Sequence, residues 1–234
     1  MFRNLILGAL ATVFLLGIAS TLVLSSTAPS RDLALGTTAL RDTASTGASP
    51  AAEVAGVQAR VFTISPGMAQ ARFVVDEVLR GSPNTVVGVT DQVSGQITVD
   101  PAQPGNAQLG PIQVNARSLS TDDNLRNNAI RRFILETDQH EWVTFAPTGV
   151  VGLPASAEPG QTYTVQVPGQ LTIRNVTRDA VFDATVTPVS ETELRGSAST
   201  TIRRGDWSIS IPQIPFVADV GDNVRLEIDF TAAS

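Results

Sequence analysis

Residues 163–186 read YTVQVPGQLTIRNVTRDAVFDATV, and this stretch decides the fold class. Apolar and polar residues alternate from Tyr163 to Val167, and the same period returns from Leu171 to Ile173. A period of two is typical of half-buried antiparallel strands. Pro168-Gly169 and the segment from Asn175 to Asp179 are expected to turn the chain between strands. The stretch therefore predicts an antiparallel β-sheet.

The same alternation recurs on both sides of this stretch. Further strands are predicted at Val61 to Ile64, Ala71 to Val78, Val86 to Val89, Gln96 to Val99, Ile112 to Ala116, Trp142 to Phe145, Val181 to Val186 and Val224 to Phe230. One segment differs: Asp123 to Glu136, DNLRNNAIRRFILE, has apolar residues at helical spacing and predicts a short amphipathic helix. Its apolar face would consist of Leu125, Ala129, Ile130 and Phe133. Many short strands with one helical interruption indicate a barrel or a sandwich.

Composition excludes several classes of function. Of the 234 residues, 42% are hydrophobic, which is enough for a sizeable core, and 16% are charged. The formal net charge is -6, and no basic stripe of the kind that nucleic-acid backbones require is present, so nucleic acid is not an expected partner. Cysteine is absent, which excludes disulfides, thiolate nucleophiles and zinc–cysteine sites. The fold must therefore depend on packing and strand pairing.

The N-terminal residues predict a membrane anchor. Leu5 to Leu24 is an uncharged apolar run of about the length that spans a bilayer, so residues 1–24 are interpreted as a transmembrane signal anchor. Arg3 precedes the run and favours an N-in, C-out orientation. The alternative is a signal peptide whose cleavage releases a secreted domain. Gly8 and Thr12 have the small-xxx-small spacing that pairs helices, so a homodimer is also considered, although small residues are common in membrane spans.

A linker and one domain follow the anchor. Residues 25–58 are rich in Ser, Thr, Ala, Pro and Gly and have no sustained apolar period, which indicates a flexible linker. Its root-mean-square reach would be on the order of 30 Å. Residues 59–234 contain all the predicted strands and form the expected folded domain. The membrane is thus a predicted partner of the chain through its N-terminal helix.

Several short segments of this domain occur in an order that resembles a known family. The most specific is Gly169 to Arg178, GQLTIRNVTR, which is similar to a Gly-x-Leu-Thr-Ile-x-Gly-Val-Thr turn. The others, in chain order, are Phe62 to Ile64, Phe73 to Leu79, Val87 to Thr90, Val93 to Ile97, Ser118 to Thr121, Arg126, Ile130 to Leu135, Trp142 to Phe145 and Thr201 to Ile209. Their order resembles the YceI-like family, exported proteins with a lipocalin-like barrel that binds polyisoprenoid lipids. The resemblance covers residues 60–230.

The chain departs from the pattern of this family at four polar positions. Met68-Ala69 stands in place of the family's His-Ser, and Arg126-Asn127 in place of Arg-Asp. His140-Glu141 replaces Tyr-Pro. Asn175 replaces the turn glycine, and asparagine tolerates the left-handed backbone of a turn. The strand pattern is kept, whereas the polar contacts of a ligand site are altered.

The resemblance implies an antiparallel lipocalin-like β-barrel of about eight strands with one short helix, preceded by the transmembrane helix. It also implies that an apolar, lipid-like ligand such as an isoprenoid lies inside the barrel. The lining is expected to include Phe73, Val75, Val114, Phe133, Phe145, Leu171, Ile173, Phe182 and Trp207, with Arg126 at the opening beside a polar head group. The alternative for each apolar residue is plain core packing in a filled barrel.

Catalysis is not expected of this domain. His140 is the single histidine, and it lies in a polar segment before a predicted strand, where an exposed turn position is the simpler interpretation. No nucleophile elbow or Gly-rich phosphate loop occurs. Asp219 to Asn223 is interpreted as a turn because the spacing of a calcium loop is missing. The sequence therefore predicts neither an enzyme nor a cofactor or metal site.

Two functions remain open at this stage. The first is an envelope-anchored protein that sequesters or carries an apolar lipid in a hollow barrel. The second is a structural or protein-interaction module of the cell envelope whose barrel is filled and whose exposed loops, Pro101 to Pro111 and Gly152 to Gln161, contact a partner. A void inside the barrel distinguishes the two hypotheses.

Overall fold

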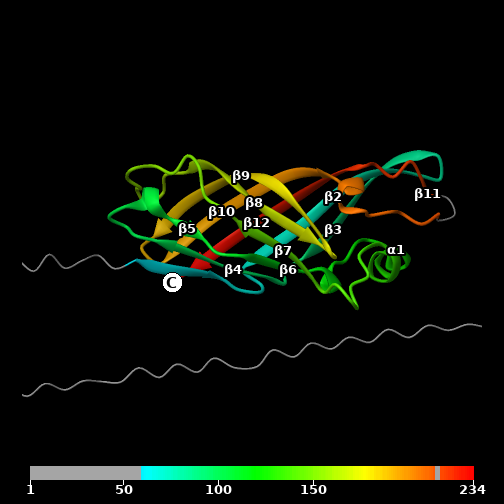
Figure 1. Cartoon of the computed structure of the whole chain (residues 1–234), viewed down its shortest axis with the longest axis horizontal. Coiled ribbons are helices and arrows are strands. Elements are labelled where there is room, and N and C mark those ends of the chain that lie inside the picture. The colour runs from blue at the N-terminus through cyan, green and yellow to red at the C-terminus, as the bar shows by residue number, and fades with distance from the viewer. Residues whose placement is uncertain (1–58, 214–216) are drawn as a thin grey trace, which may run out of the picture. The chain divides into compact units, whose positions relative to one another are not determined.

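The computed structural model describes residues 59–213 and 217–234, and the predicted alternation of residues 163–186 becomes the centre of a twisted antiparallel sheet (Figure 1). The strands are β1 Arg60–Ile64, β2 Ala69–Leu79, β3 Ser82–Thr90, β4 Val93–Val99, β5 Gln108–Leu109, β6 Ile112–Asn115, β7 Trp142–Pro147, β8 Tyr163–Ile173, β9 Val176–Ser190, β10 Glu193–Arg203, β11 Val217–Ala218 and β12 Asn223–Ala233. The helical segments are η1 Pro104–Asn106, η2 Ala116–Ser118, α1 Asn124–Ala129, η3 Ile130–Ile134 and η4 Arg204–Trp207.

The sheet closes into a barrel of eight strands. Each of β4, β6, β7, β8, β9, β10 and β12 pairs with the next in that order, and β1 joins β4 to β12. The closing contact is Thr63 opposite Ala233. Toward the other end of the barrel, β2 replaces β1 beside β12, from Ala69 opposite Phe230 to Val74 opposite Arg225. The predicted all-β antiparallel barrel with one short helix is confirmed.

The turns of the deciding stretch differ from the expectation. Pro168-Gly169 does not turn the chain, because β8 runs straight through it and pairs there with both β7 and β9. The hairpin turns instead at Arg174-Asn175, since Ile173 lies opposite Val176. Arg174, not Asn175, adopts the left-handed backbone, with φ of 57°. Its guanidinium donates to Glu136 Oε2 at 2.9 Å, which ties the turn to the segment after η3.

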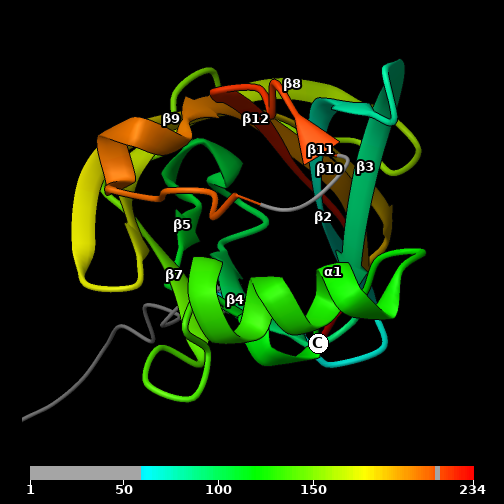
Figure 2. The same ribbon diagram turned by 90° about the vertical axis from the view of Figure 1, so that its right-hand side faces the viewer.

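Helices α1 and η3 form a cap, defined as Asn124–Ile134, at one end of the barrel. Figure 2 looks along the barrel from this end, and α1 lies across its lower part. Asp123 begins the helix because its side chain accepts a hydrogen bond from the backbone N–H of Arg126 at 2.8 Å. From Ile130 onward the helix widens to a π-turn, in which Leu135 N donates to Ile130 O at 2.8 Å. The predicted helix at residues 123–136 is thus confirmed in type.

The orientation of the predicted apolar face was wrong. Leu125 is 80% exposed and Phe133 is 62% exposed, whereas Asn127 and Ile130 are buried. The wider turn at Ile130 explains why Phe133 is exposed. In a turn with i to i+5 spacing, the third residue after Ile130 points further away from the side of the helix on which Ile130 is buried. Asn127 is buried because its Oδ1 accepts from both N and Oγ1 of Thr121, at 2.7 and 2.8 Å.

The predicted anchor, residues 1–24, and the linker, residues 25–58, lie outside the described residues. Within the part of the chain that the structure describes, every helix is too short or too polar to cross a bilayer.

Candidate ligand-binding cavity

The interior of the barrel is partly empty. A cavity of about 260 Å³ lies between the strands, and almost all of its lining residues are aliphatic or aromatic. β2, β4, β6, β7, β8, β9, β10 and β12 all contribute inward side chains to it. Phe145 and Phe182 meet edge to face in this wall, with ring centroids 4.7 Å apart. A space lined in this way is suited to an apolar guest rather than to ordered water, which needs polar partners.

One end of the cavity is covered by two loops. Pro104 of η1 and Leu109 of β5 line it from one loop, and Leu153 and Pro154 line it from the loop before β8. The same loops, Pro101 to Pro111 and Gly152 to Gln161, are the partner-binding surface expected in the filled-barrel hypothesis. Their apolar residues also form part of the cavity wall.

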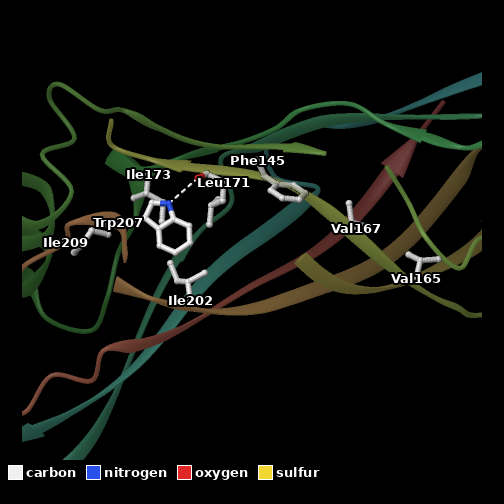
Figure 3. Packing of buried hydrophobic residues seen from close by; sticks show 8 residues of the cluster. All are labelled: Phe145, Val165, Val167, Leu171, Ile173, Ile202, Trp207 and Ile209. Carbon is white, nitrogen blue, oxygen red and sulfur yellow. Dashed lines mark hydrogen bonds between the residues drawn. The ribbon is translucent and has the colours of Figure 1, made fainter. Parts of the chain in front are cut away.

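The opposite end is closed by a buried tryptophan. Trp207 is 4% exposed, and its Nε1 donates to the carbonyl oxygen of Leu171 at 3.1 Å (Figure 3). Leu171 lines the cavity, whereas Ile173, two residues closer to the cap, does not. Ile173 and Ile202 belong to the same buried cluster as Trp207. Four members of this cluster, Phe145, Val165, Val167 and Leu171, line the cavity, whereas Ile173, Ile202, Trp207 and Ile209 pack beyond it.

Hydrogen bonds to η4 hold Trp207 in place. Arg204 donates to three backbone carbonyls, those of Ile209 at 3.0 Å, Gly221 at 3.1 Å and Val220 at 3.4 Å. Asp222 accepts from Arg203 Nε and from the backbone N–H of Gly205, both at 3.1 Å. The hydrogen bond from Arg203 is the main cause that lowers the pKa of Asp222, and the Gly205 bond adds to it. The segment from Asp219 to Asn223 is thus hydrogen-bonded to η4 and to the residue before it. The described residues contain no group of three carboxylates or imidazoles placed to hold a metal.

Glycines opposite phenylalanines keep the cavity wide. Gly88 lies opposite Phe73 on the neighbouring strand, and a Cβ at position 88 would lie 2.1 Å from Cε1 of that ring. Phe230 lies opposite Gly196 in the same way, and a Cβ there would lie 2.6 Å from the ring. The Phe145 ring reaches Gly169 diagonally from the neighbouring strand, since Phe145 pairs with Leu171, and a Cβ at position 169 would also lie 2.6 Å from it. Each phenylalanine ring occupies the space that a side chain at the glycine would take, so the ring lies flat against the barrel wall and not across the cavity.

Small residues complete the open interior. Ala184 on β9 lies directly opposite Ala198 on β10, and both line the cavity. Two methyl groups at facing positions leave a gap that larger inward side chains would fill. Neither alanine was singled out by the sequence, because an alanine in a strand carries no sign of which face it occupies.

Five of the ten residues expected at the site line the cavity: Phe73, Val114, Phe145, Leu171 and Phe182. Ile173 and Trp207 are buried in the same cluster as Phe145 and Leu171 but are not part of the lining. Val75 is half-buried on β2, opposite Val86 and two residues after Phe73, and it is not part of the lining. Phe133 lies on the outside of the cap, for the reason given above, and is not part of the lining.

Arg126 does not face the cavity. Its guanidinium donates to Glu77 Oε1 at 3.0 Å and also forms an ion pair with Asp122. Glu77 itself is an inward residue of β2, with a side chain only 5% exposed, and it also accepts from Asn84 Nδ2 at 2.9 Å. In the sequence, the only sign of this pair is that Glu77 continues the inward alternation of Phe73 and Val75, where a charged residue needs a partner. The pair fixes the cap to the barrel.

The barrel matches one protein family and several solved structures. A model of the YceI-like domain matches residues 62–232. The crystal structure of Burkholderia cenocepacia BcnA is similar at 18% identity and a TM-score of 0.56, over 73% of this chain and 99% of that one. A polyisoprenoid binding domain from Saccharophagus degradans, implicated in plant cell wall breakdown, is similar at 17% identity and a TM-score of 0.57, over 74% and 98% of the two chains.

A Campylobacter jejuni YceI protein is similar at 20% identity and a TM-score of 0.52, over 63% of this chain and 84% of that one. A search of curated proteins finds no match. At these identities the structures establish a shared fold, and the cavity described above is a property of this chain's own residues.

Proposed function

Because the chain belongs to the YceI-like domain family, we propose that it binds a polyisoprenoid or similarly apolar lipid inside its barrel. The observation that carries this proposal is the cavity of about 260 Å³ with an almost wholly apolar wall. Each methylene buried there contributes about 0.8 kcal/mol, so roughly ten would contribute about 8 kcal/mol before the cost of ordering the ligand is subtracted. The polyisoprenoid-binding description of the Saccharophagus degradans relative supports the same ligand class.

The charged residues next to the cavity do not oppose an apolar ligand. Arg72 and Glu227 border it, but they alternate with the inward residues of β2 and β12 and therefore point outward. Arg72 Nε donates to Glu227 Oε2 at 2.9 Å, and the guanidinium also pairs with Asp229. Hydrogen bonding to Glu227 is the main cause that raises the pKa of Arg72. The charges neutralise each other on the outer face.

The proposed place of action is the extracytoplasmic side of a membrane. The support is the apolar run Leu5 to Leu24 behind a single arginine, followed by the Ser-, Thr- and Pro-rich residues 25–58. A domain held on such a linker would have a root-mean-square distance of roughly 30 Å from its attachment point and could exchange lipid with that bilayer. Secretion after cleavage of the segment is the alternative.

Mass spectrometry of organic extracts tests the binding proposal directly. The full chain, purified from its native envelope in mild detergent, is expected to release one apolar lipid per domain. Residues 59–234, whose barrel closes on itself, are expected to acquire the same lipid when incubated with the extract. If neither preparation yields lipid and a crystal structure shows side chains filling the interior, the proposal is wrong and a filled module remains.

Replacing Gly88 with alanine is expected to narrow the cavity and weaken lipid binding. All three atoms nearest to the new Cβ belong to the ring of Phe73, so the ring must move, and the open side is the cavity. Each methylene of ligand that is excluded lowers the affinity about fourfold. Titration with a fluorescent polyisoprenoid analogue measures the change.

A second substitution separates the effect on the cavity from a general effect on the fold. Gly88→Ala combined with Phe73→Leu is expected to bind as the unchanged protein does, because a leucine leaves room for the methyl group. Gly149→Ala is a matched control, since nothing lies within 4 Å of a Cβ at that position. Equal binding by Gly88→Ala and Gly149→Ala would contradict the role of the glycine.

A further inference from the structure

The cap presents apolar side chains to solvent at one end of the barrel. Leu125 and Phe133 are the two most exposed of the large hydrophobic residues in the described chain, at 80% and 62%. Phe133 comes eight positions after Leu125, with the half-buried Ala129 midway, so the two lie along one side of the cap about two turns apart. Because these side chains are exposed, they contribute little hydrophobic stabilisation to the isolated domain.

The opposite side of the cap is fixed to the barrel by polar contacts. Arg126 pairs with the buried Glu77, and Asn127, which is 7% exposed, accepts two hydrogen bonds from Thr121. Ile130 is buried beside them. Rotating the cap to hide Leu125 and Phe133 would break the ion pair and leave Glu77 without its partner, which is strongly unfavourable. The outward direction of the apolar side chains is therefore fixed by the inward polar ones.

Positive charge accompanies the exposed phenylalanine. Arg131 and Arg132 immediately precede Phe133, and both side chains are exposed. Within residues 59–213 and 217–234 neither arginine forms an ion pair, and Arg131 only donates to Asn128 Oδ1 at 2.5 Å. The nearby acids are already engaged, because Asp122 pairs with Arg126 and Asp123 accepts from the helix N-terminus. The side of the cap around Phe133 thus combines apolar and cationic groups on a chain whose net charge is -6.

We propose that the cap binds the surface of an anionic phospholipid bilayer. Phe133 and Leu125 would enter the boundary between head groups and acyl chains, and Arg131 and Arg132 would contact lipid phosphates while their stems lie along the acyl boundary. A bilayer fits better than a protein groove because the cations flank the apolar residues instead of opposing defined acids, and each such arginine gains from the negative surface potential. The predicted anchor at residues 1–24 would place this bilayer within reach of the linker.

This contact is separate from both the anchor and the cavity. It belongs to the folded domain, and it does not depend on which ligand the barrel holds. It would set the orientation of the barrel, with the capped end toward the lipid.

Vesicle sedimentation with residues 59–234 tests the proposal in the absence of the anchor. The domain is expected to sediment with phosphatidylcholine–phosphatidylserine vesicles and much less with phosphatidylcholine alone. Leu125→Ser combined with Phe133→Ser is expected to lower the partition coefficient by roughly tenfold or more. Arg131→Gln and Arg132→Gln are each expected to lower it about fivefold on the anionic vesicles only.

Matched controls come from exposed valines elsewhere. Val151→Ser combined with Val181→Ser removes side chains that are 59% and 50% exposed and should leave sedimentation unchanged. Equal sedimentation of the cap and control variants would overturn the proposal. So would a dimer in analytical ultracentrifugation that the cap variant abolishes, because a second copy would then cover the patch. The lipid content of each variant, measured in parallel, reports separately on the binding proposal.

Discussion

Replacing Ala184 and Ala198 together with phenylalanine is expected to lower the affinity of the barrel for its lipid by roughly 50-fold, because two rings would exclude about three methylenes of ligand at 0.8 kcal/mol each. The two alanines face each other across β9 and β10 and both line the cavity, so the new rings have space to enter without displacing the strands. Lipid extracted per domain, and titration with a fluorescent analogue, measure the loss.

The same strands supply a control for this experiment. Val181→Phe combined with Thr201→Phe adds two rings at exposed, outward positions of β9 and β10, and it should leave the lipid content unchanged. A folded Ala184→Phe, Ala198→Phe protein that retained its full complement of lipid would show that the ligand lies elsewhere.

Trp207→Ala is expected to destabilise the domain by about 3–5 kcal/mol, the range for removing a large buried aromatic side chain. Trp207 is 4% exposed, packs with Ile173 and Ile202, and donates a hydrogen bond to the Leu171 carbonyl. Its loss would therefore create a void and also remove the indole hydrogen bond to β8. Urea unfolding followed by circular dichroism measures the change in the free energy of unfolding.

The chain contains two tryptophans, which makes the comparison direct. Trp142 is 43% exposed at the start of β7, so Trp142→Ala should change the free energy of unfolding by only about 1 kcal/mol or less. Equal losses from the two variants would mean that Trp207 does not close the barrel in the way described.

The fold could be predicted from the sequence because strand alternation is a local signal. Each of the runs from Val61 to Ile64 through Val224 to Phe230 lies within an observed strand or overlaps one. β10 is not among the predicted strands, because Gly196 to Thr201 is a run of small and polar residues without alternation. Those small residues are needed where the neighbouring Phe230 ring lies over Gly196. The packing of β10 against its neighbours therefore requires small residues, and these residues lack the alternation by which a strand is predicted.

The candidate site was only partly predictable. Alternation shows which side chains point inward, and this located Phe73, Phe145, Leu171 and Phe182. It does not show whether the interior is hollow, since that depends on facing pairs of small residues brought together by register. The role expected for Arg126 failed for a related reason, because its partner Glu77 is 49 residues away in the sequence.

The closing contact between Thr63 and Ala233 joins the first and last strands of the domain. Within this domain β12 comes last in chain order, and until it pairs with β1, β2 and β10 the barrel wall has an open seam along its length. Pairing across nearly the whole domain is slow compared with hairpin formation. The wall of the lumen is therefore the last part of the barrel to form, and a ligand can be enclosed only after β12 has paired.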